Sequence, residues 1–402
     1  MQKLKNVVIV CDYAFFEGGA ANVAIKSALS LANYTDLNVF CFAGCGEPCD
    51  ELKSSRVNVI SLNMPDLLGN KNKLDAFFKG IYNKNAGRQL KKLLSTLDNE
   101  ETIIHIHTWT KVLSSSVFEV CHELNFKTFL TIHDYFLACP NGACFNYCKN
   151  QICEIQPMSL ECIRCNCDSR SYAHKIWRCI RQYKQNKTIR NFQELNYIFI
   201  SPFEEKQLLR RFPYVQNKFL IKNPINVDGR FHIQASLNKN YVYIGRLSGE
   251  KGVRLFCEAI TRANVKGIVI GAGLLEEELK ERYSNIEFTG WQNKQQIIER
   301  LKRCRALIFP SLWYEGSPLT VPEVQAYGIP CIVTNCNSAI DDIKNGINGE
   351  IIHADMADLV NSIKRFESDE YVYKLSENTY NLFDNNRCSE KWYVENLLRI
   401  YK

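Results

Sequence analysis

The stretch YVYIGRLSGEKGVRLFCEAITRANVKGIVIGAG, residues 241–273, decides the fold of this chain. It opens with the apolar run YVYIGRL and closes with the apolar run KGIVIGAG, and each predicts a buried strand. Between them, residues 253–263 carry apolar side chains at helical spacing. Two buried strands joined by a helix form a parallel unit, so the stretch predicts an α/β fold with helices on both faces of a sheet.

The same alternation of short apolar runs and helical patterns continues in both directions. Helical patterns cover 18–34 and 73–97, and the linker-like segment 220–231 contains Asn-Pro and Asp-Gly. We therefore predict two doubly wound domains, residues 1–222 and 223–385, with the ligand cleft between them. Further strands are expected at 6–11, 37–43, 57–62, 102–107, 127–133 and 197–201 in the first domain, and at 286–290, 306–311, 331–335 and 349–352 in the second.

Length and composition fit two globular domains. The chain has 402 residues and 46% apolar side chains, and no run approaches the roughly 20 apolar residues that span a bilayer. The N-terminal apolar run is short and soon meets Asp12, so we interpret it as a strand rather than a signal peptide.

Net charge is +7, and residues 1–222 contain 28 lysines and arginines against 20 acidic residues. This excess favours an anionic partner (a membrane surface, a phosphorylated substrate or nucleic acid), with a merely soluble basic surface as the alternative.

Three features follow predicted strands of the second domain, where ligands of parallel sheets bind. In GRLSGEKG (245–252), Arg246 and Lys251 flank a glycine-rich turn, a combination that suits phosphate. Gly271, in the GAG of 271–273, precedes a predicted helix whose first amides favour an anion. The third feature is EGSPLTVPE, residues 315–323.

This third feature holds two glutamates, Glu315 in a loop and Glu323 in the next helix. No lysine or arginine lies within 311–330, so we expect both carboxylates to be unpaired and available to hydroxyl groups of a ligand. One could hold a ribose diol and the other a sugar, while Pro318 and Pro322 keep nearby backbone amides free. The alternative is two surface glutamates at a chance spacing.

In order, GRLSGEKG, GAGLLEEEL, EFTGW, EGSPLTVPE and AYGIPCIVTN resemble the donor domain of family-4 retaining glycosyltransferases. EGGAANVA, IHIHTW and TIHDYFLACPNG resemble the loops on the acceptor side of the same family. The resemblance implies the GT-B architecture, in which two Rossmann-like domains face each other across a cleft. It also implies a C-terminal helix, 386–402, that crosses back to the first domain.

The resemblance implies a role for each matching residue. Arg246 and Lys251 would neutralise the donor diphosphate, Glu323 would bind the ribose, and Glu315 would touch the transferred sugar. His133 would lie by the reacting sugar and the acceptor, whereas for His107 packing in the interface wall is the favoured interpretation. Further donor contacts would come from Gly18, Gly19, Gly271, from Trp291 within 289–292, and from the segment Gly316, Ser317, Pro318, Leu319 and Thr320. The chain departs from the family pattern at Ala20–Ala21 and at Pro322.

Eight of the 18 cysteines fall between Cys139 and Cys179, in an insertion of the first domain. In a reducing compartment they would be free thiols or metal ligands. Cys162 and Cys165 form a Cys-x-x-Cys pair with Cys153 and Cys167 as companions, so structural zinc and a loop of free thiols are both open. The basic run that follows, 175–190, favours contact with an anionic membrane, with a solvated helix as the alternative.

We therefore expect a cytoplasmic retaining glycosyltransferase, peripheral on the inner face of the plasma membrane. It would use a nucleotide-diphosphate sugar as donor, a lipid-linked or saccharide acceptor, no required cofactor and no nucleic acid. Two alternatives are a nucleotide-sugar epimerase or phosphorylase of the same fold, and a zinc-dependent nucleic-acid binder.

Overall fold

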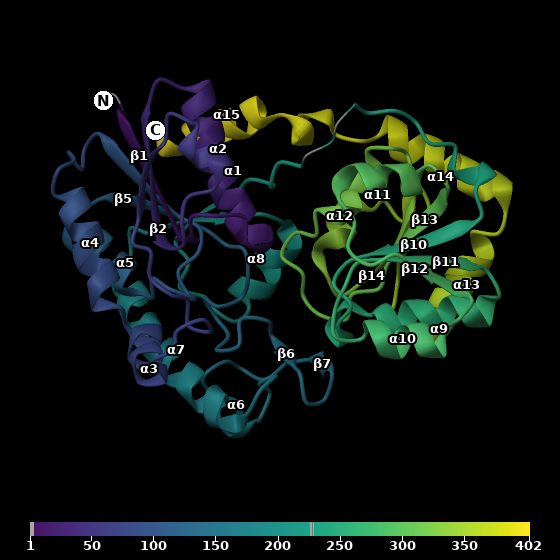
Figure 1. Cartoon of the computed structure of the whole chain (residues 1–402), viewed down its shortest axis with the longest axis horizontal. Coiled ribbons are helices and arrows are strands. Elements are labelled where there is room, and N and C mark those ends of the chain that lie inside the picture. Colours follow the sequence, from purple (N-terminus) through teal and green to yellow (C-terminus); the bar gives the residue numbers. More distant parts are fainter. Residues whose placement is uncertain (1–3, 226, 228) are drawn as a thin grey trace.

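Two parallel sheets, each covered by helices on both faces, lie side by side along the longest axis of the molecule (Figure 1). The structure is a computed structural model, and it describes residues 4–225, 227 and 229–402. The predicted α/β class with two Rossmann-like domains is confirmed. No helix in the described ranges is long and apolar enough to cross a membrane.

The first domain holds a seven-stranded sheet in the order β3-β2-β1-β4-β5-β8-β9. Its strands are β1 (Asn6–Tyr13), β2 (Asn38–Cys45), β3 (Asn58–Ser61), β4 (Thr102–Ile106), β5 (Lys127–Thr131), β8 (Asn196–Phe199) and β9 (Asn217–Leu220). Its longer helices are α1 (Gly18–Tyr34), α3 (Lys73–Ile81), α4 (Lys84–Leu94), α5 (Ser116–Glu123), α7 (Tyr172–Asn191) and α8 (Pro202–Leu209). The short elements are α2 (Asp50–Lys53), the hairpin of β6 (Phe145–Asn146) with β7 (Gln151–Ile152), and α6 (Leu160–Arg164).

The helical pattern of 73–97 forms two helices, α3 and α4. The chain turns at Asn83, whose side-chain oxygen accepts a hydrogen bond from the Ala86 amide at 3.1 Å and so caps α4. The Asn83 amide group also donates to the Val112 carbonyl at 2.8 Å. An asparagine that satisfies both a helix end and a neighbouring loop stabilises the break.

The second domain holds a six-stranded sheet in the order β12-β11-β10-β13-β14-β15. Its strands are β10 (Asn240–Ile244), β11 (Lys266–Ile270), β12 (Ile286–Phe288), β13 (Cys304–Phe309), β14 (Cys331–Thr334) and β15 (Gly349–Ile352). Its helices are α9 (Val253–Ala263), α10 (Glu276–Arg282), α11 (Lys294–Leu301), α12 (Thr320–Gln325), α13 (Met356–Arg365) and α14 (Asp369–Asn381). Four 3₁₀ turns complete this half: η1 (Ala235–Leu237), η2 (Gly249–Lys251), η3 (Ser338–Asp342) and η4 (Asn385–Cys388). Tyr241 and Tyr243 pack on one face of the sheet and Val242 on the other, as strand alternation requires.

The last helix, α15 (Glu390–Tyr401), returns to the first domain and lies beside α1 (Figure 1). The Tyr393 hydroxyl is 2.9 Å from Ser27 Oγ of α1, and the Tyr401 hydroxyl is 2.6 Å from His105 Nδ1 of β4. The C-terminal segment therefore ties the two domains together across the sheet that carries the predicted acceptor residues.

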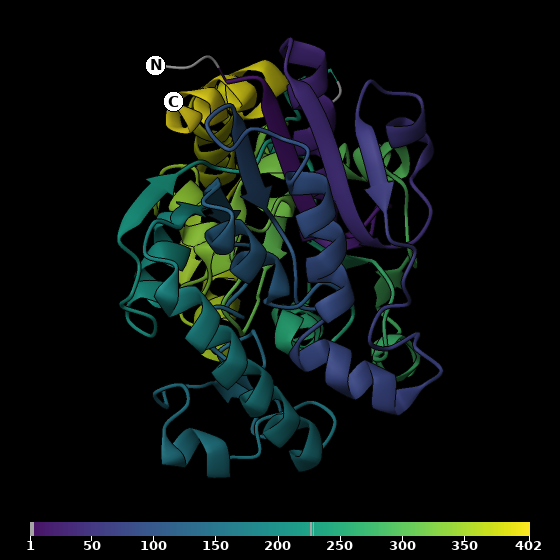
Figure 2. The ribbon, with the colours of Figure 1, turned by 90° about the vertical axis from the view of Figure 1, so that its left-hand side faces the viewer.

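The domains also touch directly, at the loop that follows β13 and at η3. Ser201 Oγ donates to the Gly316 carbonyl at 2.8 Å, and the Phe203 amide donates to Asp341 Oδ2 at 2.9 Å. Lys222 Nζ lies 3.0 Å from Asp342 Oδ1. These contacts hold the carboxyl ends of the two sheets against each other. The view in Figure 2 faces the first domain, where α3 and α7 lie close together at the end away from the termini.

Candidate active site

Two loops at the carboxyl ends of β10 and β13 meet through a glycine. Gly252, at φ +72°, ends η2 and precedes α9. A Cβ atom at this position would stand 1.9 Å from the Pro310 carbonyl oxygen, so only glycine permits the approach. As a result, Lys251 of the first loop reaches Glu315 of the second, with Nζ 2.6 Å from Oε1.

Glu315 is the centre of a small hydrogen-bonded group. Its Oε1 accepts from Lys251 Nζ, from Ser311 Oγ at 2.8 Å and from Trp313 Nε1 at 2.7 Å. The expectation that this carboxylate is unpaired is therefore wrong, because its cation comes from a loop 64 positions earlier rather than from its own stretch. The pair places a fixed cation and a fixed carboxylate together at the strand ends.

Arg246 stands in the same η2 loop and is partly tethered there. Its guanidinium lies 2.6 Å from Glu250 Oε1, and its Nε donates to Ser248 Oγ at 3.2 Å. The side chain is still 59% exposed. Arg246 therefore keeps donors available to an anion, and its charge adds to that of Lys251.

Glu323 lies in the first turn of α12, and Gly316 to Leu319 form the turn between Glu315 and that helix. Burial raises the pKa of Glu323 to about 7, although the charges of Lys26, Lys294 and Arg387 act to lower it. The carboxyl group is thus half protonated near neutral pH, and hydrogen bonds from two adjacent hydroxyls would favour its ionised form.

Glu323→Gln is expected to stabilise the ligand-free protein at pH 8 but not at pH 4. The raised pKa means that the folded state holds this proton above the unfolded pKa of about 4.5. Its stabilising contribution is complete below pH 4.5 and is lost as pH rises through 7. Glutamine mimics the protonated form, so the melting temperatures of the two proteins should agree at pH 4 and diverge progressively up to pH 8. The exposed Glu277→Gln protein serves as control, and a difference of equal size at both pH values would contradict this account.

The turn after Glu315 packs against the first domain near His133. A Cβ atom on Gly316 would stand 3.2 Å from the His133 carbonyl oxygen and 2.6 Å from Glu204 Oε1. β5 ends at Thr131, so His133 lies in the loop beyond the strand rather than inside it. The segment expected to contact the donor and the histidine expected to face the acceptor are therefore neighbours where the two domains meet.

Three histidines of the first domain stand in a row. His133 Nε2 lies 3.0 Å from His107 Nδ1, and the rings of His107 and His105 approach to 4.2 Å between centroids. Burial lowers the pKa of His133 to about 3 and holds the pKa of His107 well below its ordinary value. Both rings are neutral at pH 7, so they can exchange hydrogen bonds with sugar hydroxyls but supply no positive charge. In the described structure His107 Nε2 is buried without a partner.

The other residues that were expected to contact the donor lie outside the hydrogen-bonded group of Glu315. Gly18 and Gly19 open α1, and a Cβ atom on either would meet nothing within 4 Å. Gly271 packs instead against the chain: a Cβ atom there would stand 2.0 Å from the Gly245 carbonyl oxygen. Trp291 is 76% exposed. The helix after Gly271, α10, carries Glu276, Glu277 and Glu278 in its first turn, and these charges oppose an anion at that end.

Comparison with known proteins bears on this constellation, because residues 231–382 match the family of glycosyl transferases group 1. The matched segment, residues 231–382, is called the group 1 domain below. The match includes Arg246, Lys251, Glu315 and Glu323, and the structure places the first three in neighbouring loops.

Two curated relatives are bacterial sugar transferases. A UDP-Gal:alpha-D-GlcNAc-diphosphoundecaprenol alpha-1,3-galactosyltransferase of Escherichia coli is 31% identical over 156 residues, which are 35% of this chain and 40% of that protein. A lipopolysaccharide 1,6-galactosyltransferase of Salmonella typhimurium is 29% identical over 194 residues, or 44% and 54% of the two chains. The matched segments thus span about half the length of these relatives.

The fold extends beyond the group 1 domain. A sucrose-phosphate synthase from Thermosynechococcus elongatus superposes with a TM-score of 0.70 over 99% of this chain and 98% of its own, at 15% identity. This likeness shows the two-domain GT-B arrangement for the whole chain.

Two acidic residues of the first domain escaped the sequence-based prediction. Asp12, at the end of β1, accepts hydrogen bonds from the backbone amides of Lys111, Val112 and Leu113 and so shapes the loop after β4. Glu204 is fully buried beside Gly316 of the group 1 domain, and burial holds its pKa well above the ordinary value. Its only sequence signal is the helix-cap pattern of Ser201 and Glu204, which is typical of an exposed helix end.

The basic run on α7 does not form a continuous charged surface, contrary to what the expected contact of residues 175–190 with an anionic membrane requires. Lys175 is fully buried, and Arg181 is buried with its guanidinium donating to the carbonyls of Pro140 and Thr110. Arg178 pairs with Asp168 at 2.8 Å, and Lys184 pairs with Glu119 at 3.2 Å. The loops beneath α7 thus hold Lys175, Arg178 and Arg181, and helix α5 holds Lys184.

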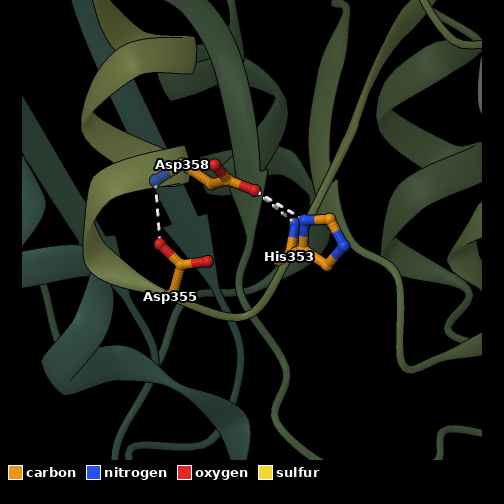
Figure 3. Close-up of side chains that lie close together, drawn as sticks. All are labelled: His353, Asp355 and Asp358. Carbon is orange, nitrogen blue, oxygen red and sulfur yellow. Dashed lines mark hydrogen bonds and ion pairs between the residues drawn. The ribbon is translucent and has the colours of Figure 1, made fainter.

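One group of candidate metal ligands lies on the surface of the group 1 domain, far in sequence from the loops above. His353, Asp355 and Asp358 have ligand atoms within 4.8 Å of one another (Figure 3). Asp355 accepts from the Asp358 amide as the N-cap of α13, and His353 Nδ1 lies 2.8 Å from Asp358 Oδ2. These hydrogen bonds explain why the three side chains lie together: they form the exposed N-terminal cap of α13.

Proposed function

We propose that the chain transfers a sugar from a nucleotide-diphosphate sugar to a lipid-linked or polysaccharide acceptor, with retention of anomeric configuration. The observation that carries the proposal is the contact of Lys251 with Glu315, beside Arg246, inside the segment that matches the glycosyltransferase family. A cation and a carboxylate fixed together in this way can bind the two parts of one ligand, the cation its diphosphate and the carboxylate its sugar.

The donor half of the reaction needs stabilisation of a departing diphosphate. Lys251 and Arg246 supply two positive charges that are already in place, which lowers the free energy of the transition state without reorganisation of the site. Glu323 would accept from the ribose hydroxyls and Glu315 from those of the sugar. The E. coli relative is named for UDP-galactose, so UDP-hexoses are the first donors to test. No resident metal is part of this proposal.

The acceptor half is supported by a groove between α3 and α7, a cavity of about 610 Å³ beside the loops after β4 and β5. Leu67, Phe77, Phe136 and Trp177 provide apolar walls, and Lys73, Lys111, Arg170, Arg178 and Arg181 stand among them. Apolar walls with cations at the rim suit an acceptor in which a diphosphate joins a sugar to a lipid. The name of the E. coli relative includes an acceptor of that class.

The outer face of α3 supports contact with a membrane at the mouth of this groove. Leu68, Leu74 and Phe78 are 59%, 74% and 65% exposed, and Lys71 and Lys73 are exposed next to them. Apolar side chains flanked by lysines fit an anionic lipid surface. In this proposal the protein lies on the cytoplasmic face of the membrane and receives its acceptor there.

The test is incubation of the purified chain with each UDP-hexose and a short-chain lipid diphosphate that carries one sugar, in the presence of EDTA. We expect a disaccharide product whose new linkage has the anomeric configuration of the donor, as read by NMR. Conversion of the donor without acceptor would indicate an epimerase, and turnover that needs phosphate would indicate a phosphorylase. Either result, or an inverted linkage, would overturn the proposal.

A further inference from the structure

Five thiols of the cysteine-rich segment surround one very small cavity, of about 10 Å³. They belong to Cys139, Cys144, Cys153, Cys162 and Cys167, and the rest of the wall is formed by Asn141, Ile155, Pro157, Lys175 and Arg211. We call this space the thiol cavity. Its volume is that of a single water molecule or ion, far below the size of a substrate site.

Lys175 enters the thiol cavity from α7. The residue has no exposed surface, and its Nζ lies 3.3 Å from Cys162 Sγ and 3.4 Å from Cys167 Sγ. A buried ammonium group is costly unless negative charge is close. The polar atoms nearest to it are thiol sulfurs, so the arrangement is best balanced when some of these thiols are ionised.

We propose that the thiol cavity is a structural zinc site with Cys139, Cys153, Cys162 and Cys167 as ligands. These four residues come from the loop after β5, the end of β7, α6 and the segment leading into α7. Four thiolates in a closed site are the preferred surroundings of structural zinc. Lys175 donates hydrogen bonds to the bound thiolates and offsets their excess negative charge.

The fifth thiol, that of Cys144, is not a zinc ligand in this proposal. Cys144 and Cys139 are hydrogen-bonded to each other, and the Cys144 carbonyl accepts from the Cys153 amide at 2.8 Å. Cys165, the second cysteine of the Cys-x-x-Cys pair, does not line the cavity, and its sulfur lies instead 3.5 Å from Asn146 Nδ2. The ligand set therefore contains Cys139 in place of the Cys165 that the sequence suggested.

Zinc would supply what this segment lacks. Residues 132–171 join β5 to α7 through a two-stranded hairpin and one helix of five residues, which is too little structure for a core of its own. In the part of the chain that the structure describes, no three of these thiol sulfurs lie within 4.8 Å of one another. A Zn–S length of about 2.3 Å sets neighbouring sulfurs roughly 3.8 Å apart, so binding draws the four elements inward and moves the Lys175 ammonium to the edge.

The same segment, residues 132–171, directly contacts the loop after β13, which carries Glu315. The Tyr314 hydroxyl donates to Glu154 Oε1 at 3.1 Å, and Arg211 donates to the Cys153 carbonyl at 3.2 Å and to the Tyr314 hydroxyl at 3.4 Å. Tyr314 directly precedes Glu315. A metal at Cys153 would thus brace the loop on which the proposed transfer depends, although the zinc site itself can be tested without assuming any activity.

The experiment is elemental analysis of the full chain, purified without chelators and without a metal-affinity step. We expect one zinc per chain in the wild type and less than a tenth of that in Cys153→Ser and Cys162→Ser. The matched controls Cys165→Ser and Cys148→Ser, also cysteines of the segment, should keep the full amount. A metal-free wild type, iron in place of zinc, or loss of zinc in Cys165→Ser would overturn the proposal.

A second measurement covers variants that fail to fold. Titration of the wild-type protein with a mercurial reagent, followed with a coloured zinc chelator, should release one equivalent of zinc. Lys175→Met separates the two roles of the cavity, because a zinc site keeps most of its metal without the lysine. A wild-type protein that releases no zinc after all its thiols have reacted would show that the ammonium, not a metal, is the resident cation and would refute the proposal.

Discussion

Replacing Lys251 with methionine is expected to lower kcat by about two to three orders of magnitude, with a smaller change in KM. Lys251 Nζ is held 2.6 Å from Glu315 Oε1 before any ligand binds, so its charge is in place when the diphosphate begins to leave. Loss of one preorganised donor of this kind typically costs about 10²–10³ in kcat. Methionine keeps most of the side-chain length and apolar packing, so the effect reports on the charge.

The control for this variant is Lys280→Met, which removes a surface lysine paired with Glu276 at 2.8 Å in the same domain. Steady-state kinetics of both proteins with a UDP-hexose and the lipid diphosphate acceptor provide the measurement. Glu315 retains its bonds from Ser311 and Trp313 without the lysine, so the circular dichroism spectrum should be unchanged. A kcat within threefold of the wild type would rule out a role for Lys251 at the leaving group.

The sequence was informative wherever one local rule determines the structure. The helix predicted at 18–34 is α1 with the same bounds, because its apolar spacing and its opening glycines agree. The rule that ligands lie beyond the carboxyl ends of parallel strands placed the loops of Lys251 and Glu315 at one edge, and the structure brings their side chains into contact.

Partners distant in the chain could not be predicted in this way. Periodicity indicates which face of an element is buried but not which residues pack against it. The pairing of Glu315 with Lys251 and the burial of Lys175 among thiols could therefore not be predicted from the sequence. Glu204 shows the same limit: its cap pattern predicts an exposed helix end, yet docking of the Gly316 turn buries it. The break at Asn83 depends on a bond to Val112, which lies 29 positions away.

Arg305 is a further residue of this kind, and Arg305→Met is expected to destabilise the protein by about 3–5 kcal/mol. The side chain belongs to β13 and is 1% exposed, although arginine is rarely found inside a strand of a buried sheet. Its guanidinium donates to the carbonyls of Ser236, Asn238, Phe366 and Glu367, and it pairs with Asp369 at 2.7 Å. The Arg305 side chain thus joins the C-terminal end of α13 and the turn η1 to strand β13 of the sheet.

Methionine fills much of the same volume but leaves four main-chain carbonyls without their donor and Asp369 without its partner. The cost is therefore dominated by unsatisfied acceptors rather than by a cavity, and Arg305→Lys should recover only part of it because an ammonium cannot reach four carbonyls in a plane. Urea unfolding of Arg305→Met, Arg305→Lys and the surface variant Lys302→Met measures this order. Since β13 leads directly to Ser311 and Glu315, we also expect weaker UDP binding by Arg305→Met at temperatures near its transition. Equal stability of Arg305→Met and Lys302→Met would mean that water or backbone movement satisfies these carbonyls, and that β13 does not depend on this arginine.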